Sequence, residues 1–170
     1  MSLSMYQASA PRFANTLKNL SAILDKAQAH CEARKVDPLV LTASRLYPDM
    51  FPLSRQVYIA TDTAKGAVSR LAGIEIPKYD DVEQTVAELK ARIAKTVDFV
   101  MSVPAAKIEG SAERDISMKI AGKDTVLKGM QYLLGHAYPN FYFHCVTAYN
   151  ILRHNGVEIG KRDFLGAVVL

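Results

Sequence analysis

Three of the four histidines, His136, His144 and His154, lie in one long segment near the carboxyl end, residues 129–156. At about 100° per residue on a helix, only His144 falls on the apolar face of this segment. Asn140 precedes it by one turn and lies close to the same face, whereas the other two histidines fall on the polar flank. An imidazole and an amide that point into a helical core could form a ligand or metal site. A hydrogen-bonded core pair is the more common arrangement.

A proline interrupts this segment shortly before His144. Either the helix kinks at Pro139, or a new helix begins there with Asn140 in its first turn. A kink would free backbone carbonyls around Gly135, which would then need partners inside the protein. The simpler interpretation is a packing adjustment. The functional one is that the break widens a pocket beside Asn140 and His144.

The bulk composition is that of an ordinary globular domain. The 170 residues are most simply one domain, with 49% hydrophobic and 22% charged residues. The net charge of +4 is spread along the chain without a basic block, so we expect neither nucleic acid nor a membrane surface as the main partner. We find no apolar run long enough to span a membrane and no signal pattern, and we expect a cytoplasmic protein.

The two cysteines give no sign of a reactive site. Cys31 and Cys145 are far apart in the sequence and match no metal-binding spacing, so we expect free thiols in a reducing compartment. Cys145 follows His144 directly, but consecutive helical residues point about 100° apart. A cysteine–histidine nucleophile pair is therefore a poor candidate.

Hydrophobic periodicity predicts an all-α fold. Four segments have helical spacing of apolar residues: 9–34, 52–72, 81–103 and 129–156. The third has an apolar face formed by Val82, Val86, Leu89, Ile93, Val97 and Val100. Between the third and fourth segments, residues 116–120 and 125–127 alternate around a possible turn at 121–122, which predicts a short β-hairpin. Residues 39–50 read as a long connection. These elements predict one helical bundle.

Three stretches resemble a known family over nearly the whole chain. They are PDMFPLSRQV at 48–57, GAVSRLAGIEIP at 66–77, and PNFYFHCVTAYNILRHNGVEIGKRDFLG from Pro139 onward. They resemble the bacterial DUF nineteen-ninety-three family of unknown function, which looks like a branch of the DinB/YfiT-like superfamily. The resemblance implies a DinB-like up-down-down-up four-helix bundle, here with the hairpin between helices three and four. Members are often dimeric, and better-known ones are hydrolases or thiol-dependent transferases that hold a divalent metal with three histidines.

The same resemblance implies a degenerate metal site. His144 stands at the second histidine position of the last helix, Asn140 replaces the first histidine, and His136 matches a supporting position. The third ligand would come from residues 56–63, where no histidine occurs. Gln56 lies near the edge of the apolar stripe of that helix. We therefore expect no resident metal, or at most a weakly bound divalent ion such as zinc or nickel.

One carboxylate, Asp62, could replace the missing ligand, but a regular helix turns it roughly opposite the stripe that contains Leu53 and Val57.

Two functions follow. In the first, the chain is a small-molecule-binding or interaction protein in which Gln56, Asn140 and His144 form a satisfied polar cluster. In the second, it is a metal-dependent hydrolase or thiol-dependent transferase that uses His144 as ligand or general base. The absent histidines favour the first function.

The carboxyl-terminal tail is the last informative feature. Val157, Ile159, Phe164, Leu165 and residues 167–170 make it more apolar than a free tail, so we expect it to dock. It could dock on its own bundle. A second subunit is slightly favoured, because aromatic residues surround the last helix, and we expect a homodimer.

Overall fold

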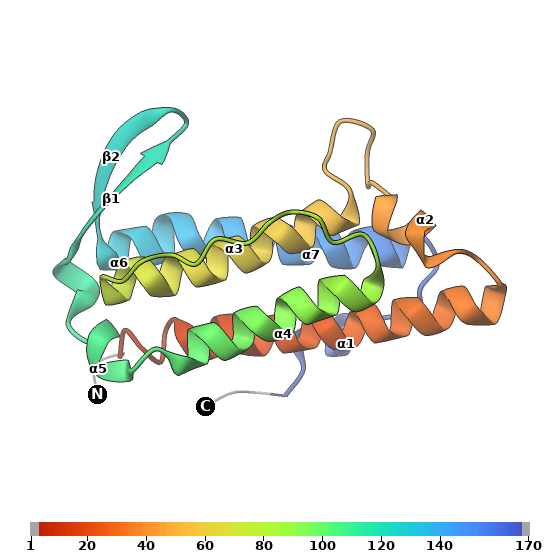
Figure 1. Cartoon of the computed structure of the whole chain (residues 1–170), viewed down its shortest axis with the longest axis horizontal. Coiled ribbons are helices and arrows are strands. Elements are labelled where there is room, and N and C mark those ends of the chain that lie inside the picture. Colours follow the sequence, from red (N-terminus) through yellow and green to blue (C-terminus); the bar gives the residue numbers. More distant parts are fainter. Residues whose placement is uncertain (1–3, 168–170) are drawn as a thin grey trace.

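The computed structural model describes residues 4–167 and is mostly helical, with one two-stranded antiparallel sheet (Figure 1). Four long helices form its body: α1 (Ala10–Arg34), α3 (Leu53–Ala72), α4 (Val86–Ser102) and α7 (Tyr138–His154). The smaller elements are α2 (Pro38–Ala43), α5 (Ala105–Ile108), η1 (Ser111–Glu113), β1 (Asp115–Ile120), β2 (Lys123–Lys128), α6 (Gly129–Tyr132), η2 (Leu133–Ala137) and α8 (Lys161–Leu165).

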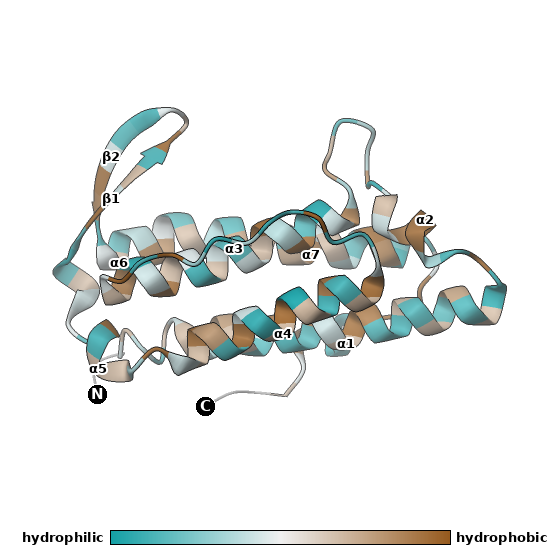
Figure 2. Ribbon diagram, in the orientation of Figure 1, coloured by the Kyte–Doolittle hydropathy of each residue, from teal (hydrophilic) through white to brown (hydrophobic). Residues whose placement is uncertain are grey.

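The long helices pack in pairs. Helix α1 packs along α4, and α3 packs along both α7 and α4. As Figure 1 shows, α1 and α7 run toward the end of the molecule that holds α2, and α3 and α4 run in the opposite direction. The small residues Ala60, Ala64 and Ala67 are fully buried on α3 and allow a close approach of neighbouring helices. Hydrophobic and hydrophilic bands alternate along the long helices in Figure 2, as is typical of amphipathic helices.

The third predicted helix begins later than its apolar pattern suggested. Helix α4 begins at Val86 because Thr85 and Glu88 form a capping box: the Thr85 hydroxyl accepts from the Glu88 amide at 3.2 Å, and the Glu88 carboxylate accepts from the Thr85 amide at 2.9 Å. Val82 therefore precedes the helix and is 71% exposed. Its predicted place on the apolar face is wrong.

The predicted hairpin is confirmed. Strands β1 and β2 pair antiparallel, with Ile116 opposite Leu127 and Ile120 opposite Lys123. Ala121 and Gly122 form the tight turn, and both have positive φ, 49° and 80°. Positive φ at both central residues is typical of the turns that match the twist of two-residue hairpins. The hairpin projects from one end of the bundle (Figure 1).

The predicted connection between the first two helices contains a helix of its own. Helix α2 is short, and the Asp37 carboxylate caps it by accepting from the Leu39 amide at 2.9 Å. Pro38 occupies its first turn, where a missing N–H costs nothing. Six residues give too few apolar repeats for periodicity to detect.

The interruption before His144 is a wider helical turn rather than a break. Residues Leu133–Ala137 form a π-helix, and Ala137 and Tyr138 keep right-handed helical dihedrals on the way into α7. Pro139 lies in the first turn of α7. Proline has no N–H to donate to the preceding turn, and a π-turn is a common irregularity within an α-helix. The segment thus stays helical up to Pro139, and no separate helix starts after a loop.

The described part of the carboxyl-terminal tail docks on its own chain. Lys26 of α1 pairs with Asp163 at 2.6 Å, and Asn19 donates to the Phe164 carbonyl at 3.1 Å. The Phe164 ring meets the Tyr149 ring edge-on, with 6.0 Å between centroids. Docking on its own bundle, the alternative weighed from the sequence, therefore holds for this part, while residues 168–170 lie outside the described range. No helix within residues 4–167 is both long and apolar enough to cross a membrane.

Candidate functional site

The histidine on the apolar face of α7 contacts a glutamine of α3. His144 is 8% exposed and lies on the inner side of α7, with its Nδ1 2.7 Å from Gln56 Oε1. The Gln56 side chain is almost completely buried, and its Nε2 donates to the Phe51 carbonyl at 2.9 Å. The sequence suggested this pairing, since His144 lies on the apolar face of its helix and Gln56 lies near the edge of the apolar stripe of α3.

This contact fixes the protonation of the imidazole. A glutamine that donates through Nε2 presents its carbonyl oxygen to His144, and that oxygen can only accept. Nδ1 of His144 therefore carries the proton, and burial lowers the pKa of the imidazole below its usual value. The neutral Nδ1–H tautomer leaves the Nε2 lone pair open.

Asn140 has a different partner from the one expected. Its Nδ2 donates to the Thr63 hydroxyl at 2.8 Å, and that hydroxyl in turn donates to the Ile59 carbonyl at 2.7 Å. Asn140 and His144 thus bond across to α3 through two separate contacts, which are one turn apart on α7 and about two turns apart on α3. Of the two α7 side chains, only His144 bonds to Gln56.

Two other candidate residues lie apart from this pair. Asp62 binds Lys65 and Arg92, each at 2.9 Å, and so faces α4 rather than α7. This is the orientation that the helical wheel gave for a carboxylate opposite the apolar stripe. His136 is half-buried and stacks on the Tyr132 ring, with centroids 5.9 Å apart. Neither side chain joins Asn140 and His144.

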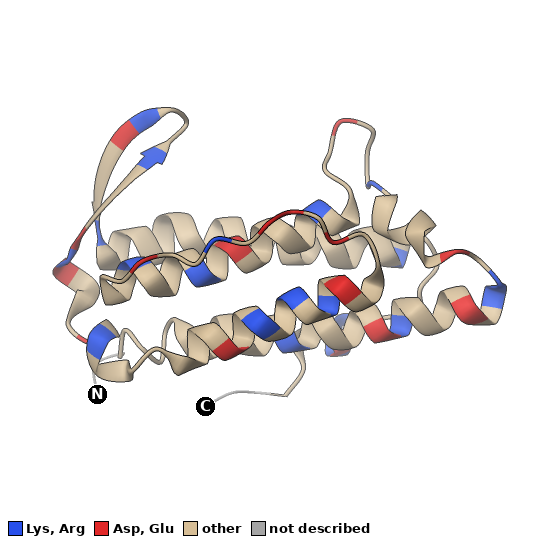
Figure 3. Ribbon diagram, in the orientation of Figure 1, with Lys and Arg blue, Asp and Glu red and all other residues tan. Residues whose placement is uncertain are grey.

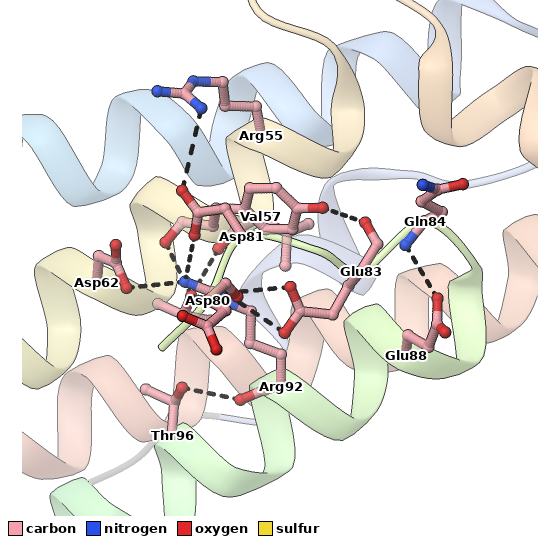
Figure 4. Close-up of polar contacts among 12 residues, drawn as sticks. Arg55, Val57, Asp62, Asp80, Asp81, Glu83, Gln84, Glu88, Arg92 and Thr96 are labelled. Carbon is pink, nitrogen blue, oxygen red and sulfur yellow. Dashed lines mark hydrogen bonds and ion pairs between the residues drawn. The ribbon is translucent and has the colours of Figure 1, made fainter. Parts of the chain in front are cut away.

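A second polar centre escaped the sequence analysis. Arg92 of α4 is 3% exposed, and its guanidinium binds three carboxylates: Asp62 at 2.9 Å, Asp81 at 3.1 Å and Glu83 at 3.1 Å (Figure 4). Its Nε also donates to the Thr61 hydroxyl at 2.8 Å. Every donor direction of this buried charge is used, as such a charge requires.

The same arginine holds the segment between α3 and α4 against the bundle. Its Nη1 donates to the Asp80 carbonyl at 2.8 Å, and its guanidinium carbon lies 4.8 Å from the centroid of the Tyr58 ring. The Tyr58 hydroxyl donates to the Glu83 carbonyl of that segment. The sequence contains a pattern that could have predicted this centre. Arg92 follows Leu89 by three residues on an apolar face, and an acidic run precedes the helix. We assign this centre a structural role, because its groups satisfy one another.

The residues around His144 do not fit the metal that the superfamily implies. One imidazole and two neutral amides are a weak donor set for zinc or nickel, which take three imidazole, thiolate or carboxylate ligands in catalytic sites. Within residues 4–167, no three His, Cys, Asp or Glu side chains are grouped so that they could hold a metal ion. The adjacent Cys145 is fully buried, and burial raises the pKa of its thiol far above the usual range, so it is no nucleophile.

Comparison with known proteins places the chain in a family. Residues 5–165 match the family described as "Domain of unknown function (DUF1993)". The chain belongs to this family. The chain is similar to a DinB family member protein from Shewanella denitrificans whose crystal structure is known. The two sequences are 47% identical, and the structures match with a TM-score of 0.91 over 97% of this chain and 93% of that one. The resemblance drawn from the sequence is confirmed, and no functionally curated protein matches the chain significantly.

Proposed function

We propose that this DUF1993 protein binds a small molecule, or a partner, at His144 and without a resident catalytic metal. The site lies where α3 meets α7, and we call its residues Gln56, Thr63, Asn140 and His144 the seam. The four long helices provide the up-down-down-up bundle of the DinB-like superfamily as a rigid support for the site. The observation that carries the proposal is the hydrogen bond between His144 and Gln56. The imidazole is already bound by an amide from the stretch of α3, residues 56–63, in which the resemblance to the superfamily implies the third metal ligand.

The electrostatics of the seam support binding more than metal chemistry. A neutral imidazole beside two amides offers hydrogen bonds and some apolar contact, but little charge to hold a divalent cation. Such buried polar networks orient a ligand and fix the register of the helices that carry them. Neither effect needs a third ligand.

A matched pair of leucine substitutions tests the proposal. His144→Leu removes the central group of the seam, whereas His154→Leu makes the same change at an exposed position of α7. A small-molecule library is screened by ligand-observed NMR against the tag-free wild type, and each hit is repeated with both variants. Hits that survive His154→Leu and disappear in His144→Leu support the proposal. Hits that bind all three proteins equally would contradict it.

The alternative function is a metal-dependent hydrolase or thiol-dependent transferase that uses His144. The observation in its favour is the open Nε2 lone pair of a neutral histidine, which can bind a metal or accept a proton. Turnover of ester, amide or thiol-transfer substrates that depends on added zinc or nickel, and that disappears in His144→Leu, would favour this function over simple binding.

We also propose a cytoplasmic homodimer that pairs through the outer side of α7. Phe143 and Val146 are exposed there, with Phe143 at 56%. Residues 138–152 contain no Asp, Glu, Lys or Arg, and the ribbon of α7 is tan along most of its length in Figure 3. A second copy can therefore approach this face without repulsion between like charges. The two buried free thiols, Cys31 and Cys145, suit a reducing compartment.

A further inference from the structure

Arg70, in the last turn of α3, lacks the acceptor that comparable basic side chains have. Within residues 4–167, every other lysine or arginine that is buried or half-buried contacts a carboxylate or a backbone carbonyl. These residues are Lys65, Lys90, Arg92 and Arg114. Arg70 is also half-buried, but in the same part of the chain neither kind of group accepts from it. A partly desolvated guanidinium without an acceptor is costly, which makes Arg70 a candidate for binding an anion.

The Arg70 side chain folds back along α3 toward Gly66. A Cβ atom at Gly66 would lie 2.7 Å from Arg70 Nη1, so a larger residue would displace the guanidinium. A glycine inside a helix also lowers the stability of that helix relative to alanine. Gly66 thus determines where the Arg70 guanidinium lies, at some cost to α3.

Tyr132 of α6 brings a second donor to the same place, at the end of the bundle that carries the hairpin (Figure 1). Its Oη accepts from Arg70 Nη1 at 3.3 Å. The side chain is 2% exposed, and burial raises the pKa of the phenol, so the hydroxyl keeps its proton at neutral pH. Nothing in the described range 4–167 accepts that proton. Within this range, an arginine and a phenol therefore meet with unused donors and no carboxylate or carbonyl to receive them.

The aromatic rings beside Arg70 hold this arrangement in place. Tyr132 stacks on His136, with 5.9 Å between ring centroids and 27° between ring planes. The guanidinium carbon of Arg70 lies 5.8 Å from the centroid of the Tyr132 ring. His136 belongs to the π-turn Leu133–Ala137, and π-turns recur at functional sites. Two contacts thus fix the Tyr132 ring, and with it the hydroxyl that meets Arg70.

We propose that Arg70 and Tyr132 form a second binding site, which takes the carboxylate group of a small molecule. A carboxylate only accepts hydrogen bonds, and its two oxygens match the planar guanidinium fork. A phosphate group shares this chemistry, but one arginine and one hydroxyl are a small donor set for its three oxygens. The site is separate from the seam, because Arg70 follows Gln56 by 14 residues, which is about 21 Å along a helix. It therefore stands independently of the proposed function.

The test compares three probes that share a phenyl ring and differ in the group offered to the site. Benzoate, the neutral benzamide and phenyl phosphate are titrated separately, at constant ionic strength and neutral pH, into the full-length protein labelled with ¹⁵N. The Nε–H signal of Arg70, assigned by its loss in Arg70→Lys, reports binding in the wild type. The backbone amides of Gly66 and Tyr132 report binding in the variants as well.

We expect a saturable millimolar shift of the Arg70 signal with benzoate and none with benzamide. Arg70→Lys removes the fork and Tyr132→Phe removes the hydroxyl, so each should weaken benzoate binding about tenfold, the effect of one hydrogen bond to a charged group. Arg153→Lys makes the same change at an exposed arginine of α7 and should leave binding unchanged. Tighter binding of phenyl phosphate would overturn the carboxylate as the ligand group. Equal shifts with benzamide, no saturable shift at any millimolar concentration, or benzoate binding that survives both site variants would overturn the site itself.

Gly66→Ala separates binding from folding. Its added methyl group displaces the Arg70 guanidinium and should weaken benzoate binding, without lowering the urea midpoint of unfolding, because alanine favours a helix interior. A Gly66→Ala protein that binds benzoate as tightly as the wild type would overturn the placement of Arg70 in the site.

Discussion

The imidazole of His144 donates to the side-chain carbonyl of Gln56 at 2.7 Å, and this bond joins α7 to the first turn of α3. Both side chains are buried, so each satisfies a group that water cannot easily reach. The contact fixes which nitrogen of the histidine is free.

The strength of this bond can be measured by a double-mutant cycle. Gln56→Leu should lower the free energy of unfolding by about 1–3 kcal/mol, because it leaves the His144 Nδ1–H buried without a partner. His144→Leu should cost a similar amount by leaving Gln56 Oε1 unpaired. The double variant should cost clearly less than the sum, by about 0.5 kcal/mol or more, in urea unfolding experiments. Additive costs would mean that the two side chains do not bond in solution.

Acid should weaken the fold through His144. Burial lowers the pKa of this imidazole in the folded state, so below its ordinary value of about 6.5 the unfolded chain binds more protons than the folded one. The contribution of His144 is therefore complete above that pH and declines as the pH falls toward the folded-state pKa. One such group gives a slope of at most about 1.4 kcal/mol per pH unit. Urea unfolding of the wild type from neutral pH downward should show this decline.

The control for this prediction is a variant that cannot titrate. In His144→Gln, the difference in unfolding free energy from the wild type should shrink as the pH falls below about 6.5. A difference that stays constant across this range would show that the imidazole is protonated equally in both states.

Arg92 should contribute far more to stability than an exposed arginine. Arg92→Met removes a buried charge and leaves Asp62, Asp81 and Glu83 facing one another. We expect a loss of about 2–3 kcal/mol rather than more, because two of the three carboxylates keep contact with water. Arg162→Met, the same change at an exposed position of α8, should alter stability by less than about 0.5 kcal/mol. Equal effects in thermal and urea unfolding would contradict the structural role of Arg92.

The sequence predicted those parts of this structure that repeat. Apolar residues recur over many turns in the four long helices, and apolar and polar residues alternate along both strands of the hairpin. Because each pattern repeats several times, it can be recognised in the sequence. The same helical periodicity placed His144 on the apolar face of its segment and Gln56 near the edge of the apolar stripe of α3. The Thr85–Glu88 capping box was legible in the sequence and marks where α4 begins, but hydrophobic spacing alone extended the helix to 81.

The remaining features depend on contacts that no local pattern contains. The partners of Arg92 come from α3 and from the segment before α4, at positions 61, 62, 81 and 83, and only the folded chain brings them together. The choice of Thr63 rather than Gln56 for Asn140 depends on the register of two antiparallel helices. The π-turn before Pro139 depends on how the backbone accommodates a residue that has no N–H to donate.

Metal analysis separates the binding function from its enzymatic alternative. We expect protein purified without an affinity tag to contain far less than one equivalent of zinc or nickel per chain, because neutral amides do not replace imidazole ligands. Elemental analysis after dialysis provides the measurement, with His144→Ala as the matched variant. About one equivalent in the wild type that is lost in His144→Ala would make the metal-dependent enzyme the leading function.

The last prediction concerns self-association through α7. Phe143 and Val146 expose apolar surface on a helix face without charged residues, and a two-fold axis would place this face against itself. Phe143→Lys should therefore raise the dimer dissociation constant by at least about 30-fold, since burying a new charge opposite its own copy costs about 2 kcal/mol or more. Val82→Lys changes an even more exposed apolar residue outside α7 and should leave the dimer intact. Light scattering at micromolar concentration measures both variants. A monomeric wild type would reject the dimer, and a Phe143→Lys protein that stays dimeric would move the interface away from this face.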